Sequence, residues 1–282
     1  MNIKFTKMHG CGNDYVYING ISQDIQADIK PDMVRALSDR HFGIGGDGVI
    51  FINSSDIADF EMEMWNADGT RAEMCGNGIR CVAKYVYDYG LTDKDVVDIC
   101  SFDKVKHIIL TIKDGKAVEA RVDMGEPILV PSEIPTTAIG VDKVIKYPID
   151  VNGQVVDVTC VSMGNPHAIV YVDNVEDLEI EKIGPFIENH SFFPKRTNVE
   201  FVQNIDKNHI SMRVWERGTG ETLACGTGCC ALTVAGVLNG LTDREVEIQV
   251  LGGKINVKWD ETDNHVYMTG PATTVFDGEI DY

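Results

Sequence analysis

The chain has 282 residues, of which 44% are hydrophobic, so its length suits about two ordinary globular domains. Its 44 acidic and 25 basic residues give a formal net charge of −19, which argues against nucleic acid or an anionic membrane as a partner. The N-terminus shows no signal or transit pattern. Residues 222–242 carry no charge but are interrupted by glycines, so we expect a buried helix there and not a membrane span.

The cysteines indicate reduced thiols. Eight cysteines at scattered spacings are unlike the disulfide framework of a secreted protein, so we expect a cytoplasmic setting. There is no Cys-x-x-Cys pair, and the histidines do not fall at zinc-ligand spacings. We therefore predict no metal site, although Cys225, Cys229 and Cys230 are crowded enough to keep structural zinc as a minor alternative.

The first 70 residues alternate short strands with glycine-rich turns. We predict strands over 3–7 and 15–18 around a polar turn at 9–14, a short helix over 31–40, and an irregular glycine-rich loop over 40–48. Strands over 49–52 and 60–65 follow, the second leading into a turn at 66–70.

A cysteine then stands before a Gly-x-Gly turn, in Met74-Cys75-Gly76-Asn77-Gly78. We predict that this turn opens a helix from about Gly76 to Tyr89 that is capped by Gly90. Apolar positions at helical spacing predict its buried face: Ile79, Val82, Ala83, Val86 and Tyr87. Strands are predicted over 104–112 and 118–122, and prolines at 127, 131 and 135 mark a boundary between two halves.

The second half repeats the first. An offset of 150 residues pairs Gly240-Leu241-Thr242-Asp243 with Gly90-Leu91-Thr92-Asp93, and it also pairs Trp215 with Trp65 and Cys225 with Cys75. An offset of 152 places Gly164-Asn165-Pro166-His167 on Gly12-Asn13-Asp14-Tyr15. Matches at one offset across many landmarks indicate an internal duplication. Two similar domains related by a pseudo-twofold axis would direct both cysteine-bearing helix ends toward one cleft.

The duplicated cysteines permit three kinds of chemistry. They are a redox pair, or one is a nucleophile with His167 as its base, or both are acid–base groups on opposite faces of a substrate. The third interpretation explains the duplication directly, because a racemase removes a proton from one face of a carbon and returns one to the other. Thiols titrate near neutral pH, and helix N-termini can bind a substrate carboxylate. Two-base racemisation or epimerisation is therefore the favoured hypothesis.

Five motifs together resemble the diaminopimelate epimerase family: residues 9–14 (His-Gly-Cys-Gly-Asn-Asp), 65–69 (Trp-Asn-Ala-Asp-Gly), 74–81, 164–167 and 216–228. The resemblance covers almost the whole chain. It implies cofactor-independent interconversion of LL- and meso-diaminopimelate, on the route to lysine and peptidoglycan. It also implies an α+β fold of two similar pseudo-symmetric domains, each a β-barrel-like sheet around a central helix. We expect one domain over 1–126, to which a final strand at 271–282 returns, and a second over 127–270.

The resemblance assigns roles to individual residues. Cys75 and Cys225 match the two catalytic thiols, and His167 and Glu216 match groups that tune them. Four residues match the backbone cradle for the reacting carboxylate: Gly76, Asn77, Gly226 and Thr227. Six match substrate contacts: Asn13, Asn66, Asn165, Asn198, Glu216 and Arg217. Gly48 stands where some members have a substrate-contacting glutamine, although other members also have glycine. Phe276 matches a dimer-contact aromatic residue, so a homodimer is expected.

Two alternatives remain. Another cofactor-independent racemase, of the proline or hydroxyproline type, would share the two-thiol logic but would need no clamp for a second amino-acid head group. A thiol redox or metal-binding protein without turnover is a rival from a different class. The remaining cysteines are expected to be packing residues, since most unpaired cysteines are small buried hydrophobes.

Overall fold

The structure is a computed structural model that describes residues 1–72 and 75–282. Met74, the first residue of the cysteine motif quoted above, lies outside the described residues. Contacts within the chain divide it into two compact units, Met1–Val122 with Thr269–Tyr282, and Asp123–Met268. We call these unit 1 and unit 2.

Unit 1 is a sheet with two helices. Its elements are β1 (Asn2–Gly10), β2 (Asn13–Asn19), α1 (Lys30–Ser38), β3 (Gly48–Asn53), β4 (Phe60–Asn66), β5 (Arg71–Ala72), α2 (Gly76–Asp88), β6 (Val96–Ser101), β7 (Lys104–Lys113), β8 (Lys116–Asp123) and β18 (Thr273–Asp281). Strand β17 (Val266–Pro271) spans the boundary with unit 2. The predicted elements over 3–7, 15–18, 31–40, 49–52, 60–65, 104–112 and 118–122 are all confirmed within a few residues.

Unit 2 follows the same plan. Its elements are β9 (Tyr147–Val151), β10 (Gln154–Ser162), β11 (Pro166–Tyr171), α3 (Ile180–Glu188), β12 (Asn198–Asn204), β13 (His209–Glu216), β14 (Gly220–Thr222), α4 (Gly226–Leu238), β15 (Glu245–Val250) and β16 (Gly253–Trp259). Helix α4 has 13 residues, as α2 does, and begins 150 positions later (226 − 76).

The pairing of the strands repeats with the sequence. In unit 1, β2 pairs parallel with β3, which places Val49 opposite Val16, and β3 pairs antiparallel with β4, which places Val49 opposite Trp65. In unit 2, β11 and β12 pair parallel and β12 and β13 antiparallel, so that Val199 lies opposite Ala168 and Trp215. The parallel pairs β4–β6 and β13–β15 correspond in the same way. The duplication seen in the sequence is therefore a duplication of topology.

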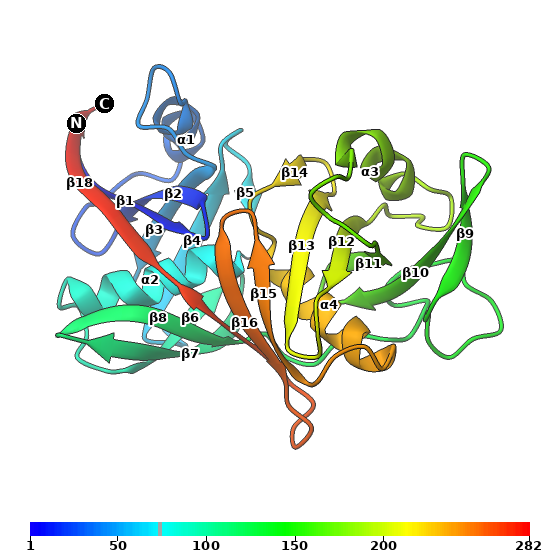
Figure 1. Ribbon diagram of the computed structural model, residues 1–282. Coiled ribbons are helices and arrows are strands. Elements are labelled where there is room, and N and C mark those ends of the chain that lie inside the picture. The colour runs from blue at the N-terminus through cyan, green and yellow to red at the C-terminus, as the bar shows by residue number, and fades with distance from the viewer. Residues whose placement is uncertain (73–74) are drawn as a thin grey trace. The chain divides into compact units, whose positions relative to one another are not determined.

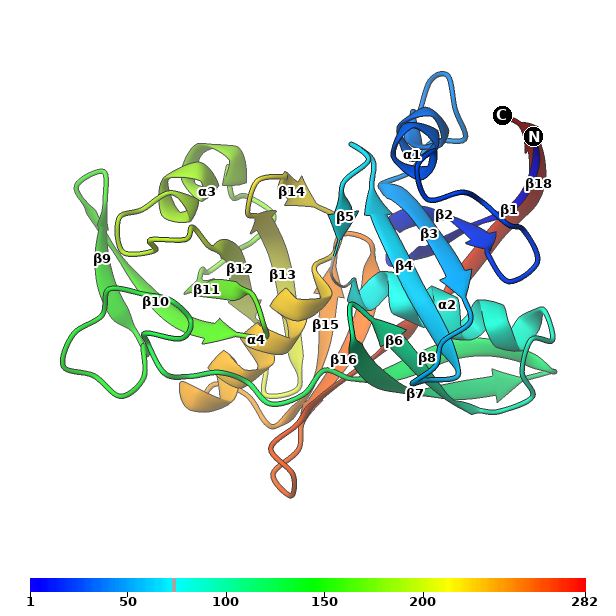
Figure 2. The same cartoon turned by 180° about the vertical axis from the view of Figure 1, so that it is seen from behind.

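Each unit encloses one helix. Helix α2 contacts β1, β2, β6 and β7, and helix α4 contacts β10, β11, β12, β15 and β16. Figures 1 and 2 show α2 and α4 each lying among the strands of its own unit, whereas α1 and α3 lie outside. Ten residues of α4 are buried, because the helix is apolar on every side. The predicted α+β class, with a sheet wrapped around a central helix in each half, is confirmed. Among the described residues, no helix combines the length and apolarity that a membrane crossing requires.

Some local predictions need correction. The predicted turn at 9–14 is tighter than expected, because β1 continues to Gly10 and β2 begins at Asn13. Only Cys11 and Gly12 form the turn, both with positive φ (52° and 81°). On α2, Tyr85 is buried and Tyr87 only partly so, since the helix is packed on more than one side. For the same reason the side chain of Arg80 is fully buried.

Candidate active site

Cys75 is the N-cap of α2. Its backbone is extended (φ −134°, ψ 115°), and its Sγ accepts a hydrogen bond of 3.3 Å from the backbone N–H of Gly78. An N-cap side chain normally accepts from this position, since the first N–H groups of a helix have no carbonyl partner within it. The Gly-x-Gly turn thus places a half-buried thiol at the positive end of a helix, where a thiolate is favoured.

Asn13 holds this thiol from the neighbouring strand. Its Oδ1 accepts from the Cys75 Sγ at 3.1 Å and from the Asn77 amide at 3.4 Å. Its Nδ2 donates to Asp47 Oδ2 at 2.6 Å, and the backbone N–H of Asp14 donates to the same carboxylate oxygen at 3.1 Å. The predicted contacts Asn13 and Asn77 therefore lie together with Cys75, and Asp47 of the glycine-rich loop fixes the orientation of the amide.

Arg80 supports the first turn of α2 from inside. Its guanidinium is fully buried and donates to Asn77 Oδ1 at 2.9 Å and to the backbone carbonyls of Gly76 at 3.2 Å and Pro271 at 3.3 Å. Because an arginine side chain presents several donors in one rigid plane, it can hold these groups in one geometry. Sequence reasoning missed this residue, although a lone arginine among buried helix positions was the available signal.

Cys225 is the corresponding N-cap of α4, and its neighbours form a chain of hydrogen bonds. Its Sγ lies 3.5 Å from the hydroxyl of Thr227, which accepts from the Asn165 amide at 3.2 Å. Asn165 Oδ1 lies 3.1 Å from His167 Nε2. An amide oxygen only accepts, so Nε2 carries a proton in this arrangement. The structure thus brings four of the predicted residues of unit 2 into one connected group.

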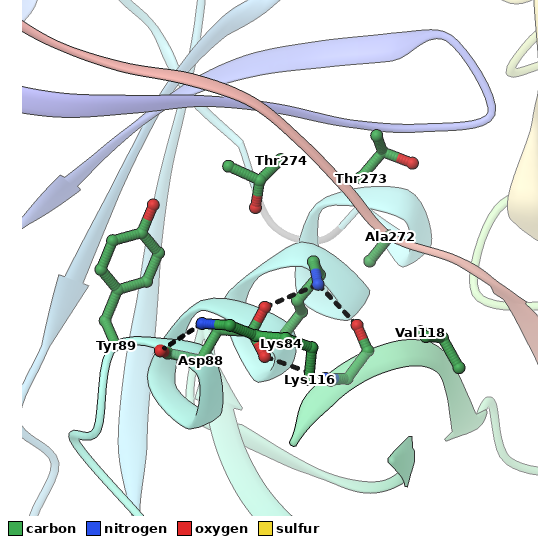
Figure 3. Close-up of a pocket in the computed structure, with 9 residues that line it drawn as sticks. Lys84, Asp88, Tyr89, Lys116, Val118, Ala272, Thr273 and Thr274 are labelled. Carbon is green, nitrogen blue, oxygen red and sulfur yellow. Dashed lines mark hydrogen bonds and ion pairs between the residues drawn. The ribbon is translucent and has the colours of Figure 1, made fainter. Parts of the chain in front are cut away.

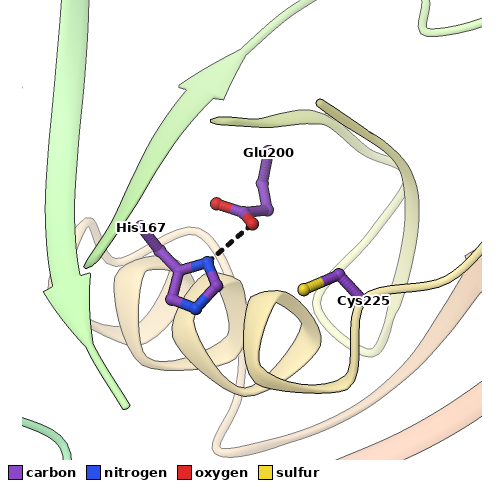
Figure 4. Close-up of side chains that lie close together, drawn as sticks. All are labelled: His167, Glu200 and Cys225. Atoms are coloured by element: carbon purple, nitrogen blue, oxygen red, sulfur yellow. Dashed lines mark hydrogen bonds and ion pairs between the residues drawn. The ribbon is translucent and has the colours of Figure 1, made fainter. Parts of the chain in front are cut away.

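The chain ends at a buried carboxylate, shown in Figure 4. His167 Nδ1 lies 2.7 Å from Glu200 Oε1, and both side chains are completely buried. Glu200 was not predicted, although a single acid among the apolar residues of β12 was a usable signal, because fully buried acids are rare unless they are paired. Burial raises the pKa of the Cys225 thiol, and the nearby carboxylates of Glu216 and Glu200 raise that pKa further.

Asn198 joins two segments of unit 2. Its Nδ2 donates to the Pro166 carbonyl at 3.0 Å, and its Oδ1 accepts from the Arg217 backbone N–H at 2.9 Å. The hydroxyl of Thr222 donates to Glu216 in the same turn. The Arg217 guanidinium is exposed and donates to the Lys195 carbonyl at 3.1 Å. The two hydrogen bonds of Asn198 therefore tie this turn to the start of β11, next to His167.

Asn66 is the last residue of β4 and leads into the turn that follows. Its side chain donates to the Thr70 hydroxyl at 3.1 Å, and it lies opposite Gly48 in the pairing of β3 with β4. A Cβ atom at Gly48 would lie 2.0 Å from the backbone oxygen of Trp65, so the backbone around residue 48 accommodates only glycine without shifting. This steric limit explains why glycine, and not glutamine, occupies position 48 in this chain.

The two cysteine sites differ at two corresponding positions. In unit 1, a Cβ atom at Gly78 would lie 2.9 Å from Ile50 Cδ1, whereas in unit 2 a Cβ atom at Gly228 would lie 2.5 Å from Glu200 Oε1. Ile50 and Glu200 therefore occupy equivalent places beside the two helix ends. The counterpart of His167 is Tyr15, whose pKa is raised mainly by burial and also by Cys75 and Asp47. The two units share their topology, but their cysteine sites differ. Cys225 has a buried His–Glu pair beside it, whereas Cys75 has a tyrosine and an isoleucine at the equivalent positions.

A cavity of about 480 Å³ on unit 1 lies away from these residues. Figure 3 shows it between the end of α2, the start of β8 and β18, lined by Lys84, Asp88, Tyr89 and Lys116 among others. Lys84 pairs with Asp88 at 2.6 Å, and Lys116 donates to the Asp88 carbonyl at 3.1 Å. None of the predicted site residues lines it. We therefore place the candidate site residues around the cysteines, where each unit has a thiol, a helix N-terminus and buried polar groups close together.

Comparison with solved structures defines the fold class. The structure of a phenazine biosynthesis protein of the PhzF family from Bacillus anthracis is 17% identical and matches with a TM-score of 0.69 over 100% of both chains. A hydroxyproline epimerase from Agrobacterium vitis, solved with bound trans-4-hydroxy-L-proline, is 13% identical and matches with a TM-score of 0.67 over 99% of this chain and 91% of that one. The fold is thus shared with a phenazine biosynthesis protein and a hydroxyproline epimerase.

Sequence comparison then gives the family. A family model described as diaminopimelate epimerase matches residues 5–130 and 159–275. Proteins named diaminopimelate epimerase from Acetivibrio thermocellus and Methanococcus maripaludis are 53% identical over 281 residues and 55% identical over 280 residues, and each alignment covers at least 99% of both chains. One from Leptospira biflexa is 53% identical over 282 residues and 100% of both chains. The chain belongs to the diaminopimelate epimerase family, which confirms the resemblance found in its motifs.

Proposed function

We propose that this protein interconverts LL- and meso-2,6-diaminopimelate by proton transfer between its two cysteines and the α-carbon of the substrate. The observation that carries the proposal is the presence of a thiol at the N-cap of both duplicated helices, in a chain of this family. Membership of the family supports the substrate, and the paired thiols support the mechanism. The proposal requires both thiols to act on the same α-carbon, and it involves no cofactor.

In each turnover, one thiolate removes the α-proton and the other thiol delivers a proton to the opposite face of the carbon. One C–H bond breaks and one forms, and the two sulfur atoms exchange protonation states. Either cysteine can act as acid or base, depending on the direction of the reaction. Burial raises the pKa of Cys225 and so favours its protonated form before turnover. When Cys225 starts as the acid, we propose Cys75, whose Sγ accepts from the Gly78 N–H, as the base.

The predicted carboxylate cradle is supported by its place in the helices. Gly76, Asn77, Gly226 and Thr227 are the first two residues of α2 and of α4, where backbone N–H groups attract anions. A carboxylate bound there would also stabilise the negative charge that develops as the α-proton leaves. We propose that His167 and Glu216 tune Cys225, and that Asn165 and Asn13 hold the thiols and substrate in register.

We assign the remaining contacts to the second amino-acid group of the substrate. Asn66, Asn198, Glu216 and Arg217 lie in the turns that follow β4 and β13 or are hydrogen-bonded to them. Arginine binds a carboxylate through two parallel hydrogen bonds, which suits a distal α-carboxylate. Substrates that lack the second group, such as proline and hydroxyproline, are therefore not expected to be turned over.

The test is deuterium exchange. Freshly reduced protein incubated with LL-diaminopimelate in deuterated water should introduce deuterium at an α-carbon and produce the meso isomer without pyridoxal phosphate. Cys75→Ala and Cys225→Ala should each lose epimerisation, since one base cannot serve both faces. Absence of exchange in reduced protein would disprove the function, and full turnover in either alanine variant would disprove two-base catalysis. Turnover of proline in its place would reassign the substrate.

We propose further that units 1 and 2 are the two duplicated domains and that the protein works as a cytoplasmic homodimer. The eight cysteines lack the spacing of a disulfide framework, which suits a reducing compartment. Phe276 on β18 is 47% exposed and packs edge-on against Phe5, with 5.9 Å between ring centroids. Light scattering should give the mass of a dimer for the native chain and of a monomer for Phe276→Asp; a monomeric native protein would contradict the assembly.

A further inference from the structure

The group around Cys225 has the composition of a transition-metal site. One ligand atom from each of His167, Glu200 and Cys225 lies within 4.8 Å of the other two, and all three residues are buried. An imidazole, a carboxylate and a thiol are the three side-chain types that bind zinc. Figure 4 shows the imidazole, the carboxylate and the Sγ converging beside the first turn of α4. The ligands come from β11, β12 and a helix cap, so no short sequence motif announces them.

The three ligand atoms lie within 4.8 Å of one another and would move closer to tetrahedral spacing around an ion. Bond lengths of about 2.0–2.3 Å to nitrogen, oxygen and sulfur place the ligand atoms of tetrahedral zinc about 3.2–3.8 Å apart. His167 Nδ1 and Glu200 Oε1 are 2.7 Å apart, so an entering ion would replace their shared proton and move them apart by about half an ångström or more. The other ring nitrogen, Nε2, already faces Asn165 Oδ1 at 3.1 Å. Histidines that bind metals usually donate their second N–H to such an oxygen.

Charge and unused bonding capacity point the same way. Glu200 Oε2 is buried and has no hydrogen-bond partner among the described residues. An unsatisfied buried oxygen of this kind calls for an explanation, of which an ion is one. A divalent cation with one thiolate, one carboxylate and a neutral imidazole is electrically neutral overall. It would thus offset the cost of burying two negative charges side by side.

We infer that His167, Glu200 and Cys225 form a binding site for a thiophilic divalent cation such as Zn²⁺, and that an ion bound there reversibly blocks the enzyme. On binding, the Cys225 thiol and the His167–Glu200 pair each release a proton to solvent, and a metal–sulfur bond forms. The blocked state rests on the proposed function, because Cys225 then cannot donate or accept a proton. Binding itself does not depend on that function.

Unit 1 provides an internal control. Its thiol, Cys75, has Tyr15 and Ile50 at the positions of His167 and Glu200, and an isoleucine side chain cannot bind a metal. The described residues of unit 1 contain no group of three ligands that meets the same distance limit. The inference therefore predicts one tight site per chain, located in unit 2, although the chain has two equivalent cysteines.

The experiment uses cobalt as a spectroscopic substitute for zinc. Reduced full-length protein titrated with Co²⁺ in the absence of oxygen should develop a near-ultraviolet thiolate-to-cobalt band with one equivalent, and Zn²⁺ should abolish it. Cys75→Ala should keep the band and Cys225→Ala should lose it. Glu200→Gln should bind cobalt more weakly by about tenfold or more. Zn²⁺ should also stop deuterium exchange, and EDTA should restore it.

The outcomes are separable. No band in the native protein, or an unchanged band in Cys225→Ala, would overturn the site, whatever the catalytic activity of the protein. Loss of the band in Cys75→Ala would show that unit 1 contributes to the metal site, and would overturn the assignment of the site to unit 2. If a variant fails to fold by circular dichroism, X-ray absorption of the native zinc protein decides the question. One sulfur with nitrogen and oxygen ligands supports the site, and two sulfurs contradict it.

Discussion

Replacing Gly228 by alanine should disrupt the buried His–Glu pair without touching either residue of that pair. The new Cβ atom would lie 2.5 Å from Glu200 Oε1 and 3.1 Å from its carboxyl carbon. Contacts that short cannot persist, so the carboxylate must move away from His167 and give up the 2.7 Å contact with Nδ1. Loss of a buried charge-assisted hydrogen bond costs about 1.5–3 kcal/mol, and overpacking adds about 1–3 kcal/mol.

Helix propensity acts in the opposite direction. Alanine is favoured over glycine within a helix by about 1 kcal/mol. The net expectation is that the free energy of unfolding falls by about 2–4 kcal/mol, as measured by urea denaturation. The matched control is Gly78→Ala, where the new Cβ atom meets the terminal methyl of Ile50 at 2.9 Å and that methyl can shift. For the control, the propensity gain offsets most of the steric cost, so we expect a change below about 1 kcal/mol.

A double-mutant cycle tests the cause. Glu200→Ala removes the atoms with which the new methyl group collides, so adding Gly228→Ala in that background should cost much less than in the native chain. Equal stability losses for Gly228→Ala and Gly78→Ala, or a Gly228→Ala cost that is unchanged in the Glu200→Ala background, would refute the reasoning.

Three further predictions concern other parts of the fold. Arg80→Met removes three guanidinium hydrogen bonds, to Asn77 Oδ1 and to the Gly76 and Pro271 carbonyls, and should lower the free energy of unfolding by at least about 2 kcal/mol in urea denaturation; native-like stability would contradict this. The pKa of His265 is raised chiefly by its hydrogen bond with Asp123. The stability that this bond contributes is therefore complete below about pH 6.5 and is lost as the pH rises through the higher pKa of the folded state. The melting temperature should decline over that range in the native protein, and Asp123→Asn should remove this decline. Gly48→Gln should destabilise the protein by about 1–3 kcal/mol or more, because its Cβ atom meets the Trp65 backbone, and a thermal melt no lower than native would disagree.

The sequence allowed the site's framework to be predicted because glycine, cysteine and the 150-residue offset carry local information. Both helices start where the Gly-x-Gly turns indicated, and Gly90 has the positive φ (70°) expected of a helix C-cap. Trp65 and Trp215 pack against the cores of their own units while remaining partly exposed. These features depend on neighbours close in the chain, or on a repeat that can be read by eye.

What escaped prediction depends on partners distant in the sequence. Glu200 meets His167 across 33 positions, because β11 and β12 pair in parallel after a long connection through α3. Arg80 meets the Pro271 carbonyl across 191 positions. Helix α3 was missed as well. The sequence shows that Glu200 and Arg80 are charged residues in apolar segments. It does not show which distant groups compensate their charges, because the pairing of strands determines those partners.

The pairing of β1 with β18 makes unit 1 discontinuous in the sequence. Residues Asn2 to His9 lie opposite residues Asp281 to Thr273, and the amino group of Met1 donates to the carbonyl of Tyr282. The closing strand of unit 1 therefore follows the whole of unit 2, whereas unit 2 is formed by one continuous stretch. Removing β18 should leave unit 2 folded but expose the edge of β1, and an unpaired strand edge can pair with another chain. A protein shortened in this way should therefore be prone to aggregation.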